Sequence, residues 1–234
     1  MSPLLRSLSE IAVKRLFRTA VLEQVDELAE HVRLLRLVGD DLRGVTWVPG
    51  QKLQLRIEGF TTRTFTPIHW DAQAGVTSIV AAMHGSGPGA DYVGGMQAGQ
   101  ACQFFGPRSS IDLSSITGLV LMAGDETSIG LAVAAKSVEG LTAEHALETS
   151  LPQQTQQLLD ALDVRDAVLL PPEPEDALAR HVLDVVERSP EITVVLTGRA
   201  QSIRKVRSTM KQSGAHRGRT IVRSYWDENR AGLD

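Results

Sequence analysis

The second half of the chain alternates continuous apolar runs with amphipathic segments, and this alternation restricts the fold more than any other feature. Residues 118–123 (GLVLMA) form an unbroken apolar run, which is typical of a parallel strand buried on both faces. We predict further strands over 143–149, 167–170, 192–197 and 220–225, with helices over 127–138, 153–162, 176–188 and 201–212. Strands separated by helices imply right-handed crossovers, so residues 116–234 are expected to form an α/β domain with a doubly wound parallel sheet.

The first half has a different pattern, with short alternations of apolar and polar residues punctuated by glycine and proline. Strand candidates lie at 31–38 (HVRLLRLV), 52–57 (KLQLRI), 75–83 (GVTSIVAAM) and 100–105. Such a pattern favours a small antiparallel barrel or sandwich. We therefore predict an N-terminal antiparallel β-barrel over residues 1–115, with the boundary between the two domains within 109–117.

Composition and charge exclude several classes of protein. Apolar residues make up 42% of the chain, which excludes global disorder, and the formal charge of −4 argues against a nucleic-acid partner. No apolar run approaches the roughly 18 residues of a membrane-spanning helix, and the N-terminus does not resemble a secretory signal. The single cysteine, Cys102, excludes a disulfide within the chain. We expect a cytoplasmic protein without stable membrane insertion.

Two strand ends of the α/β domain carry glycine where a ligand would bind. Ligands of open α/β sheets lie outside the carboxyl ends of the strands, and glycine lets the backbone approach them closely. The residues at these two ends are Gly124, Asp125, Glu126 and Thr127 after the first strand, and Gly198 and Arg199 after the fourth. The alternative is that each glycine only permits a tight turn.

The segment Arg63-Thr64-Phe65-Thr66-Pro67 carries groups suited to a flavin. Arg63 offers a bidentate fork to a pyrophosphate, and the ring of Phe65, two positions on, faces the same side of a strand and can lie against a flavin ring. The hydroxyl of Thr66 can donate to a flavin nitrogen. An ordinary exposed strand would show the same pattern, but the segment resembles the flavin signature of the ferredoxin-reductase superfamily.

Further motifs, in the same order along the chain, resemble the siderophore-interacting proteins, which are flavin-dependent ferric-siderophore reductases. They are the glycine-rich loop His84-Gly85-Ser86-Gly87-Pro88-Gly89-Ala90, the turn Phe105-Gly106-Pro107-Arg108, the Gly124–Thr127 loop, and the tail that begins at Tyr225-Trp226. The resemblance extends over about residues 20–234. Phe65 stands where this family usually has tyrosine, Ala90 where it often has serine, and Asp227 where a basic residue is common.

The resemblance implies a role for each motif. Arg63, Phe65 and Thr66 would contact FAD. The pyrophosphate would be held by backbone N–H groups of the loop formed by His84, Gly85, Gly87, Pro88, Gly89 and Ala90. The nicotinamide nucleotide would meet residues 124–127, with Gly198 and Arg199, and Trp226 would lie near the flavin or the substrate channel. The implied activity is NAD(P)H-dependent, FAD-mediated reduction of a ferric siderophore or chelate, in which the flavin carries the chemistry and no protein metal site is needed.

Several questions stay open at this level. The basic residues Arg199, Arg204, Lys205, Arg207 and Lys211 form either a solvated helix face or a site for the 2′-phosphate of NADPH. The first twenty residues have the pattern of an amphipathic helix, which would pack on the body or on another subunit, with membrane contact a weaker choice. Alternative functions are a flavin reductase with another acceptor, or a non-catalytic siderophore or nucleotide binder. Both a monomer and a homodimer are compatible with the sequence.

Overall fold

The computed structural model describes residues 16–83, 88–172 and 176–227. The chain divides into two compact units, Met1–Ser109 (unit 1) and Ser110–Asp234 (unit 2). The functional limits expected from the sequence, 1–115 and 116–234, remain a prediction. Several predictions concern residues outside the described ranges: most of the N-terminal amphipathic helix, His84, Gly85 and Gly87 of the loop, and the tail after Asp227.

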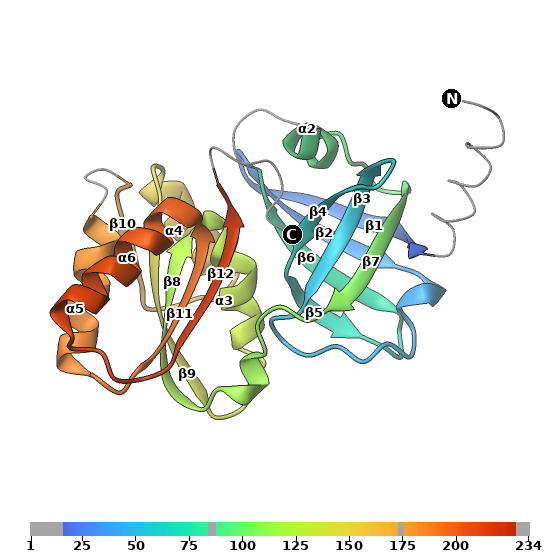
Figure 1. The fold of residues 1–234 in the computed structure, drawn as a ribbon. Coiled ribbons are helices and arrows are strands. Elements are labelled where there is room, and N and C mark those ends of the chain that lie inside the picture. Colours follow the sequence, from blue (N-terminus) through green and yellow to red (C-terminus); the bar gives the residue numbers. More distant parts are fainter. Residues whose placement is uncertain (1–15, 84–87, 173–175, 228–234) are drawn as a thin grey trace. The chain divides into compact units, whose positions relative to one another are not determined.

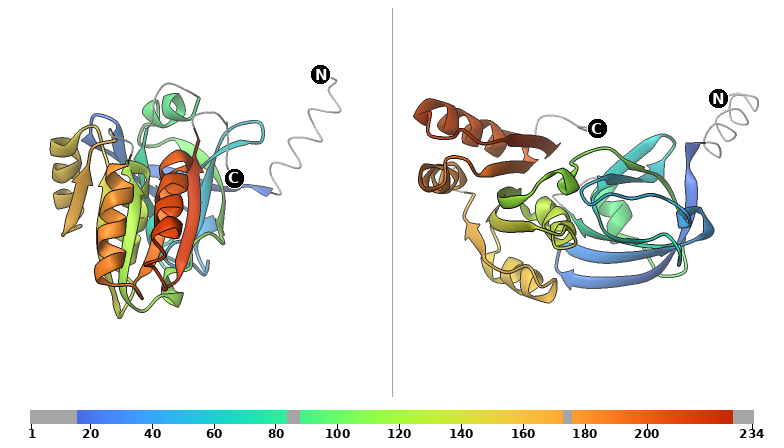
Figure 2. Two further views of the ribbon diagram at one scale, coloured as in Figure 1. Left: turned by 60° about the vertical axis from the view of Figure 1, so that its left-hand side comes forward. Right: turned by 90° about the horizontal axis from the view of Figure 1, so that it is seen from below.

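Unit 1 is an antiparallel sheet of seven strands that curves into a barrel (Figures 1 and 2). Its strands, in chain order, are β1 (Arg18–Ala29), β2 (Val32–Val38), β3 (Lys52–Glu58), β4 (Thr61–Phe65), β5 (Pro67–Asp71), β6 (Val76–Ala82) and β7 (Ala101–Arg108). They lie side by side in the order β4-β3-β7-β1-β2-β6-β5. The two edge strands, β4 and β5, are joined directly through Thr66, and the short helix α2 (Pro88–Gly94) follows β6.

The barrel is filled by the inward-facing residues of its alternating strands. Leu35 and Leu37 of β2, Leu53 and Leu55 of β3, and Phe104 of β7 are completely buried. Burying one such side chain stabilises the fold by about 1.5–3 kcal/mol. The period-two pattern that predicted β2 and β3 therefore reflects the core itself.

The period-two pattern missed β1 and β5, the short helix α2 was not among the predicted helices, and β4 was expected only as the strand that carries Arg63 and Phe65. Only Ala20 and Leu22 are fully buried in β1, whose other apolar residues, such as Val21 and Val25, are exposed or half-buried among charged and polar ones, so its alternation is short. The polar sequence of β4, TTRTF, has no buried residue. These segments form strands because they pair with more apolar neighbours, β1 with β2 and β4 with β3.

Unit 2 is a parallel five-stranded sheet with helices on both faces (Figures 1 and 2). Its strands are β8 (Gly118–Asp125), β9 (Leu141–Glu148), β10 (Ala167–Leu170), β11 (Thr193–Arg199) and β12 (Thr220–Trp226), in the order β10-β9-β8-β11-β12. The predicted fold class, an antiparallel barrel followed by a doubly wound parallel sheet, is confirmed. The strand order reverses between β8 and β11, which makes their carboxyl ends the topological switch point.

Two helix layers cover the sheet of unit 2. The helices α5 (Ala177–Arg188) and α6 (Ala200–Ser213) share one hydrophobic cluster with β8 and β11, whereas α3 (Ile129–Ala135) packs into a second cluster. The fourth helix, α4 (Pro152–Ala161), connects β9 to β10. The predicted helix 127–138 begins instead as a short 3₁₀ turn, η3 (Glu126–Ser128), that leads into α3. Within the described ranges, no helix has the length and apolar character needed to cross a membrane.

Candidate functional site

In the structure, Arg63 of the predicted flavin signature packs against the first turn of α2. A Cβ atom added to Gly89 would clash with Nε of Arg63 and would lie 2.9 Å from its Cδ. The extended strand β4 therefore brings the guanidinium onto the start of α2, where the glycine-rich loop ends. Two motifs that are more than twenty residues apart in the sequence meet at this point.

Arg63 is held in a way that suits a pyrophosphate ligand. Its Nη1 donates to the backbone oxygen of Thr62 at 3.0 Å, and its other N–H groups donate to no residue in the described part of the chain. A half-buried guanidinium with remaining donors, packed on a glycine, is a cradle for a phosphate group. The residues present therefore fit FAD.

Phe65 and Thr66 lie at the end of β4, two and three residues beyond Arg63. Phe65 pairs with Leu53 of β3 and packs, half-buried, against the hydrophobic core of unit 1. Thr66 connects β4 to β5 and is also half-buried. The structure thus places both residues at one strand end with Arg63, while their contact with a flavin remains a prediction.

Arg33 is a residue of this region that sequence reasoning missed. Its Nη1 donates to the backbone oxygens of Val93 and Met96 at 3.1 and 3.3 Å, so it ties the carboxyl end of α2 to β2. The signal in the sequence was a charged residue within the apolar strand HVRLLRLV. Its buried Nε has no acceptor among the residues described.

A polar network on the other face of β3 was also missed. Gln54 is 5% exposed, and its Oε1 accepts a hydrogen bond from Arg108 Nη1 at 2.9 Å. Its Nε2 lies 3.4 Å from the hydroxyl oxygens of Thr62 and Thr64 on β4. The guanidinium of Arg108 stacks 4.9 Å from the centre of the Phe105 ring. Gln54 thereby braces the strand that carries Arg63 against β3 and β7.

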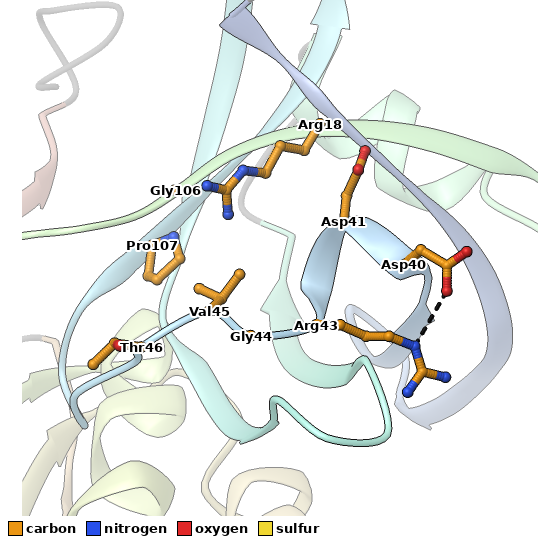
Figure 3. Close-up of a pocket in the computed structure, with 9 residues that line it drawn as sticks. All are labelled: Arg18, Asp40, Asp41, Arg43, Gly44, Val45, Thr46, Gly106 and Pro107. Atoms are coloured by element: carbon orange, nitrogen blue, oxygen red, sulfur yellow. Dashed lines mark hydrogen bonds and ion pairs between the residues drawn. The ribbon is translucent and has the colours of Figure 1, made fainter.

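Unit 1 also has a polar hollow of about 540 Å³, which lies near the start of β1 and the 3₁₀ turn η1 (Asp40–Leu42). Figure 3 shows Arg18 reaching across it toward Gly106-Pro107, while Arg43 turns to Asp40. Arg43 Nε donates to Asp40 Oδ1 at 3.1 Å, and Asp41 accepts the backbone N–H of Thr19 at 2.8 Å. None of the residues predicted to bind a cofactor lines this hollow.

In unit 2, the carboxylate of Asp125 is a hydrogen-bonding centre at the switch point. Its Oδ1 accepts the backbone N–H of Thr127 at 2.9 Å and the hydroxyl of the same residue. Its Oδ2 accepts the backbone N–H of Arg199 and the indole N–H of Trp226, both at 2.8 Å. Asp125 is 4% exposed. The sequence-predicted residues Asp125, Thr127, Arg199 and Trp226 are therefore brought together.

The two glycines at the strand ends are required by close packing. A Cβ on Gly198, which has a φ of +94°, would lie 2.6 Å from the Asp125 carboxylate, and a Cβ on Gly124 would clash with the Ser128 hydroxyl. The Ser128 hydroxyl itself accepts a hydrogen bond from Thr197 Oγ1 at 2.7 Å. Both glycines thus serve contacts within unit 2, and their predicted approach to a nucleotide remains a prediction.

Arg199 and Trp226 form a stacked pair on neighbouring strands. They are register partners of β11 and β12, and the Arg199 guanidinium lies 5.9 Å from the centre of the Trp226 ring. At the next position, Asp227 accepts from Arg204 Nη1 at 3.4 Å and from Gln201 Nε2 at 3.2 Å. Asp227 therefore offsets part of the positive charge of α6.

A buried carboxyl group at the end of β9 was not foreseen. Glu148 is 5% exposed, and its Oε2 accepts the hydroxyl of Ser202 at 2.5 Å. Burial raises the pKa of the Glu148 carboxyl, which the Ser202 hydrogen bond opposes. Because Glu148 pairs in register with Asp125, two carboxyl groups lie at the same sheet edge. Only its position at a strand end, in the run HALET, could have pointed to it.

His145 and Cys102 are both buried in strands. His145 is 5% exposed on β9, and burial lowers its pKa to about 4. Cys102 is buried in β7, where burial raises the pKa of the thiol to about 11. Among the residues described, no group of three or more histidine, cysteine or acidic side chains is placed to hold a metal ion.

Comparison with known proteins gives these sites a family context. Residues 30–111, which include Arg63, Phe65, Thr66 and Gly89, match the family model of the siderophore-interacting FAD-binding domain. The resemblance stated from the sequence is thereby confirmed for the flavin domain. No curated protein is significantly similar to the chain in sequence.

Solved structures share the fold over both units. A siderophore utilization protein from T. fusca has a TM-score of 0.71 and 21% identity, with 93% of this chain and 95% of that chain covered. A siderophore-interacting protein from Aeromonas hydrophila has a TM-score of 0.72 and 16% identity, covering 92% and 93%. Ferredoxin-NADP+ reductase from Plasmodium falciparum has a TM-score of 0.62 and 10% identity, covering 89% and 96%. The chain therefore has the two-domain fold of the ferredoxin reductases.

Proposed function

We propose that this chain, whose residues 30–111 match the model of the siderophore-interacting FAD-binding domain, is an FAD-containing oxidoreductase that uses NAD(P)H to reduce ferric siderophores. Siderophores hold ferrous iron more weakly than ferric iron, so reduction would release the metal. The iron complex is the substrate in this proposal, and NAD(P)H is the electron donor. In this proposal the protein is cytoplasmic and has no nucleic-acid partner.

The observation that carries the proposal is the packing of Arg63 on Gly89. A guanidinium fixed at the start of α2, with donors still available, is suited to the pyrophosphate of a dinucleotide. Backbone N–H groups of the preceding loop would add to this attraction. Arg33 and Gln54 support the arrangement by fixing α2 and β4, respectively.

Bound FAD would accept electrons in a pair from NAD(P)H and pass them singly to ferric iron. The protein's own residues then have positioning tasks. Phe65, supported by the core on one side, would present its ring to the flavin, and Thr66 would donate its hydroxyl at the same strand end. Phe65 and Thr66 need not act as a general acid or base, because the step from the flavin to ferric iron is an electron transfer.

The switch point of unit 2 is the proposed binding edge for the nicotinamide nucleotide. Gly124, Thr127 and Gly198 lie at strand ends where such ligands bind in doubly wound sheets. Arg204, Lys205, Arg207 and Lys211 are exposed on α6 and supply positive charge for a 2′-phosphate. Asp227 pairs with Arg204 and so offsets part of this positive charge. The preference for NADPH over NADH that the basic residues of α6 give would therefore be modest.

The test is reduction of ferric chelates of different charge by the FAD-loaded protein with NADH or NADPH. Reduction that is faster with ferric siderophores than with free flavins as acceptors supports the proposal. Equal or faster reduction of free flavins would make the chain a general flavin reductase. A protein that binds a siderophore but never retains FAD would be a binding module instead.

A further inference from the structure

We propose that Asp125 is a positioning residue, which holds Trp226 and Arg199 in place and does not itself contact the nucleotide through its side chain. This refines the contact predicted for residues 124–127. It rests on the proposed function only for the role of Trp226 and Arg199 at the nucleotide-binding edge. The hydrogen bonds to Asp125 are a property of unit 2 and do not depend on that function.

The Asp125 carboxylate is already engaged by hydrogen bonds within the protein. A carboxylate has about four lone-pair positions, and Asp125 accepts four hydrogen bonds, two at each oxygen. The group is also 4% exposed. A nucleotide hydroxyl or amide could therefore bind this side chain only by displacing a partner within the protein.

The four donors to Asp125 come from three different elements of unit 2. Thr127 belongs to η3, Arg199 ends β11 and Trp226 ends β12, so one carboxylate joins three elements at the switch point. The missing side chain of Gly198 is what allows the approach, because a Cβ there would lie 2.6 Å from the carboxylate. Such an arrangement fixes the ends of two neighbouring strands relative to β8.

Asp125 also organises the stacked pair of Arg199 and Trp226. The same atom, Oδ2, accepts the backbone N–H of Arg199 and the indole N–H of Trp226. The guanidinium and the indole of these two residues stack at 5.9 Å. The Oδ2 atom of Asp125 thus fixes the backbone of β11 at Arg199 and also the orientation of the Trp226 ring. At the predicted nucleotide edge, the positions of this pair are therefore set within the protein itself.

The isosteric variant Asp125→Asn tests this directly. Asparagine has one acceptor oxygen, so at least two of the four donors lose their partner, and its own NH₂ group opposes a donor. The readout is hydrogen exchange of the Trp226 indole N–H, followed by NMR and assigned by its disappearance in Trp226→Phe. We expect exchange about tenfold faster or more in Asp125→Ala, which removes both acceptor oxygens, and an equal or smaller change in Asp125→Asn, whose one oxygen can keep two of the four donors. Asp160→Asn, which removes an exposed carboxylate from α4, is the matched control and should exchange as the wild type does.

An unchanged exchange rate in folded Asp125→Ala, which has no acceptor left for the Trp226 indole N–H, would overturn the proposal. If that variant does not fold, the wild-type protein decides alone: an indole N–H of Trp226 that exchanges as fast as free indole would contradict the hydrogen bond, and a protected one supports it. These readouts need neither FAD nor a siderophore, so they stand even where the proposed reduction fails.

Kinetics separate positioning from a purely structural role. For the FAD-loaded protein, kcat/KM for NAD(P)H is measured in Asp125→Asn, Trp226→Phe and the double variant. If Asp125 acts through Trp226, the double variant loses no more than the larger single loss. Losses that multiply both in this cycle and in the corresponding cycle with Arg199→Ala would show that Asp125 acts independently of the two residues and would overturn the proposal.

Discussion

Arg63 lies so close to Gly89 that no side chain fits between them. The aliphatic carbons and Nε of the arginine occupy the space that a Cβ of residue 89 would need, with Cγ at 3.0 Å. This contact joins β4 to the start of α2, and the account of flavin binding depends on it.

Replacing Gly89 by alanine should therefore move the arginine. The end of the Arg63 side chain is flexible and can give way, so the fold should survive while the guanidinium leaves its place. We expect FAD affinity to fall several-fold, with a free energy of unfolding within about 1 kcal/mol of wild type. Gly94→Ala is the control, because its Cβ would meet only Met83 Sδ at 3.8 Å. Equal FAD affinity in both variants would count against the contact.

Removing the guanidinium tests its charge. Arg63→Ala should weaken FAD binding by about 10- to 100-fold, the range expected for a hydrogen bond to a charged group. Fluorescence titration of FAD into the apoprotein measures this. The comparison is Arg36→Ala, which removes an exposed arginine that pairs with Glu23 on the same barrel. Unchanged flavin affinity in Arg63→Ala would reject a pyrophosphate role.

Phe65→Tyr restores the residue more usual in the siderophore-interacting family. The ring would keep its packing against the core and gain a hydroxyl, so FAD binding should be equal or tighter. The dissociation constant of FAD is again the measurement. A clear loss of flavin would mean that the ring at position 65 does not face the ligand.

His145 should make the stability of the protein depend on pH. Burial lowers its pKa from 6.5 to about 4, so the unfolded chain takes up a proton at a higher pH than the folded protein does. The free energy of unfolding is therefore unaffected by protonation of His145 above about pH 6.5 and falls as the pH is lowered towards 4. The total loss is about 3 kcal/mol. His145→Leu should flatten this part of the urea-unfolding profile, whereas the exposed His31→Gln should not. A profile in His145→Leu that is as steep as in the wild type would contradict this assignment.

The parallel unit could be predicted from the sequence nearly completely, because its central strands β8 and β11 are buried on both faces and its helices are amphipathic. The apolar runs that become β8 and β11 are set by the core they occupy, and the predicted helices agree with α4, α5 and α6 to within a few residues. The barrel was harder. The strands β1 and β4 are held mainly by pairing with neighbours, and backbone pairing leaves little trace in a polar sequence such as TTRTF.

The candidate site shows the same division. Arg63, Asp125 and Arg199 stand out in the sequence because they flank glycine or belong to a motif. Arg33, Gln54 and Glu148 do not, since their importance comes from partners far along the chain: α2, β4 with β7, and Ser202 of α6. The register of neighbouring strands decides such contacts, and local patterns do not encode that register.

The central claim is that the chain binds FAD and passes electrons from NAD(P)H to ferric siderophores. The most direct measurement is the absorbance spectrum of the purified protein with added FAD, followed through reduction and reoxidation. The account predicts bound flavin bands that are bleached by NAD(P)H and restored by a ferric siderophore. A protein that stays colourless after FAD is added, or whose flavin is never bleached by NADH or NADPH, would contradict it.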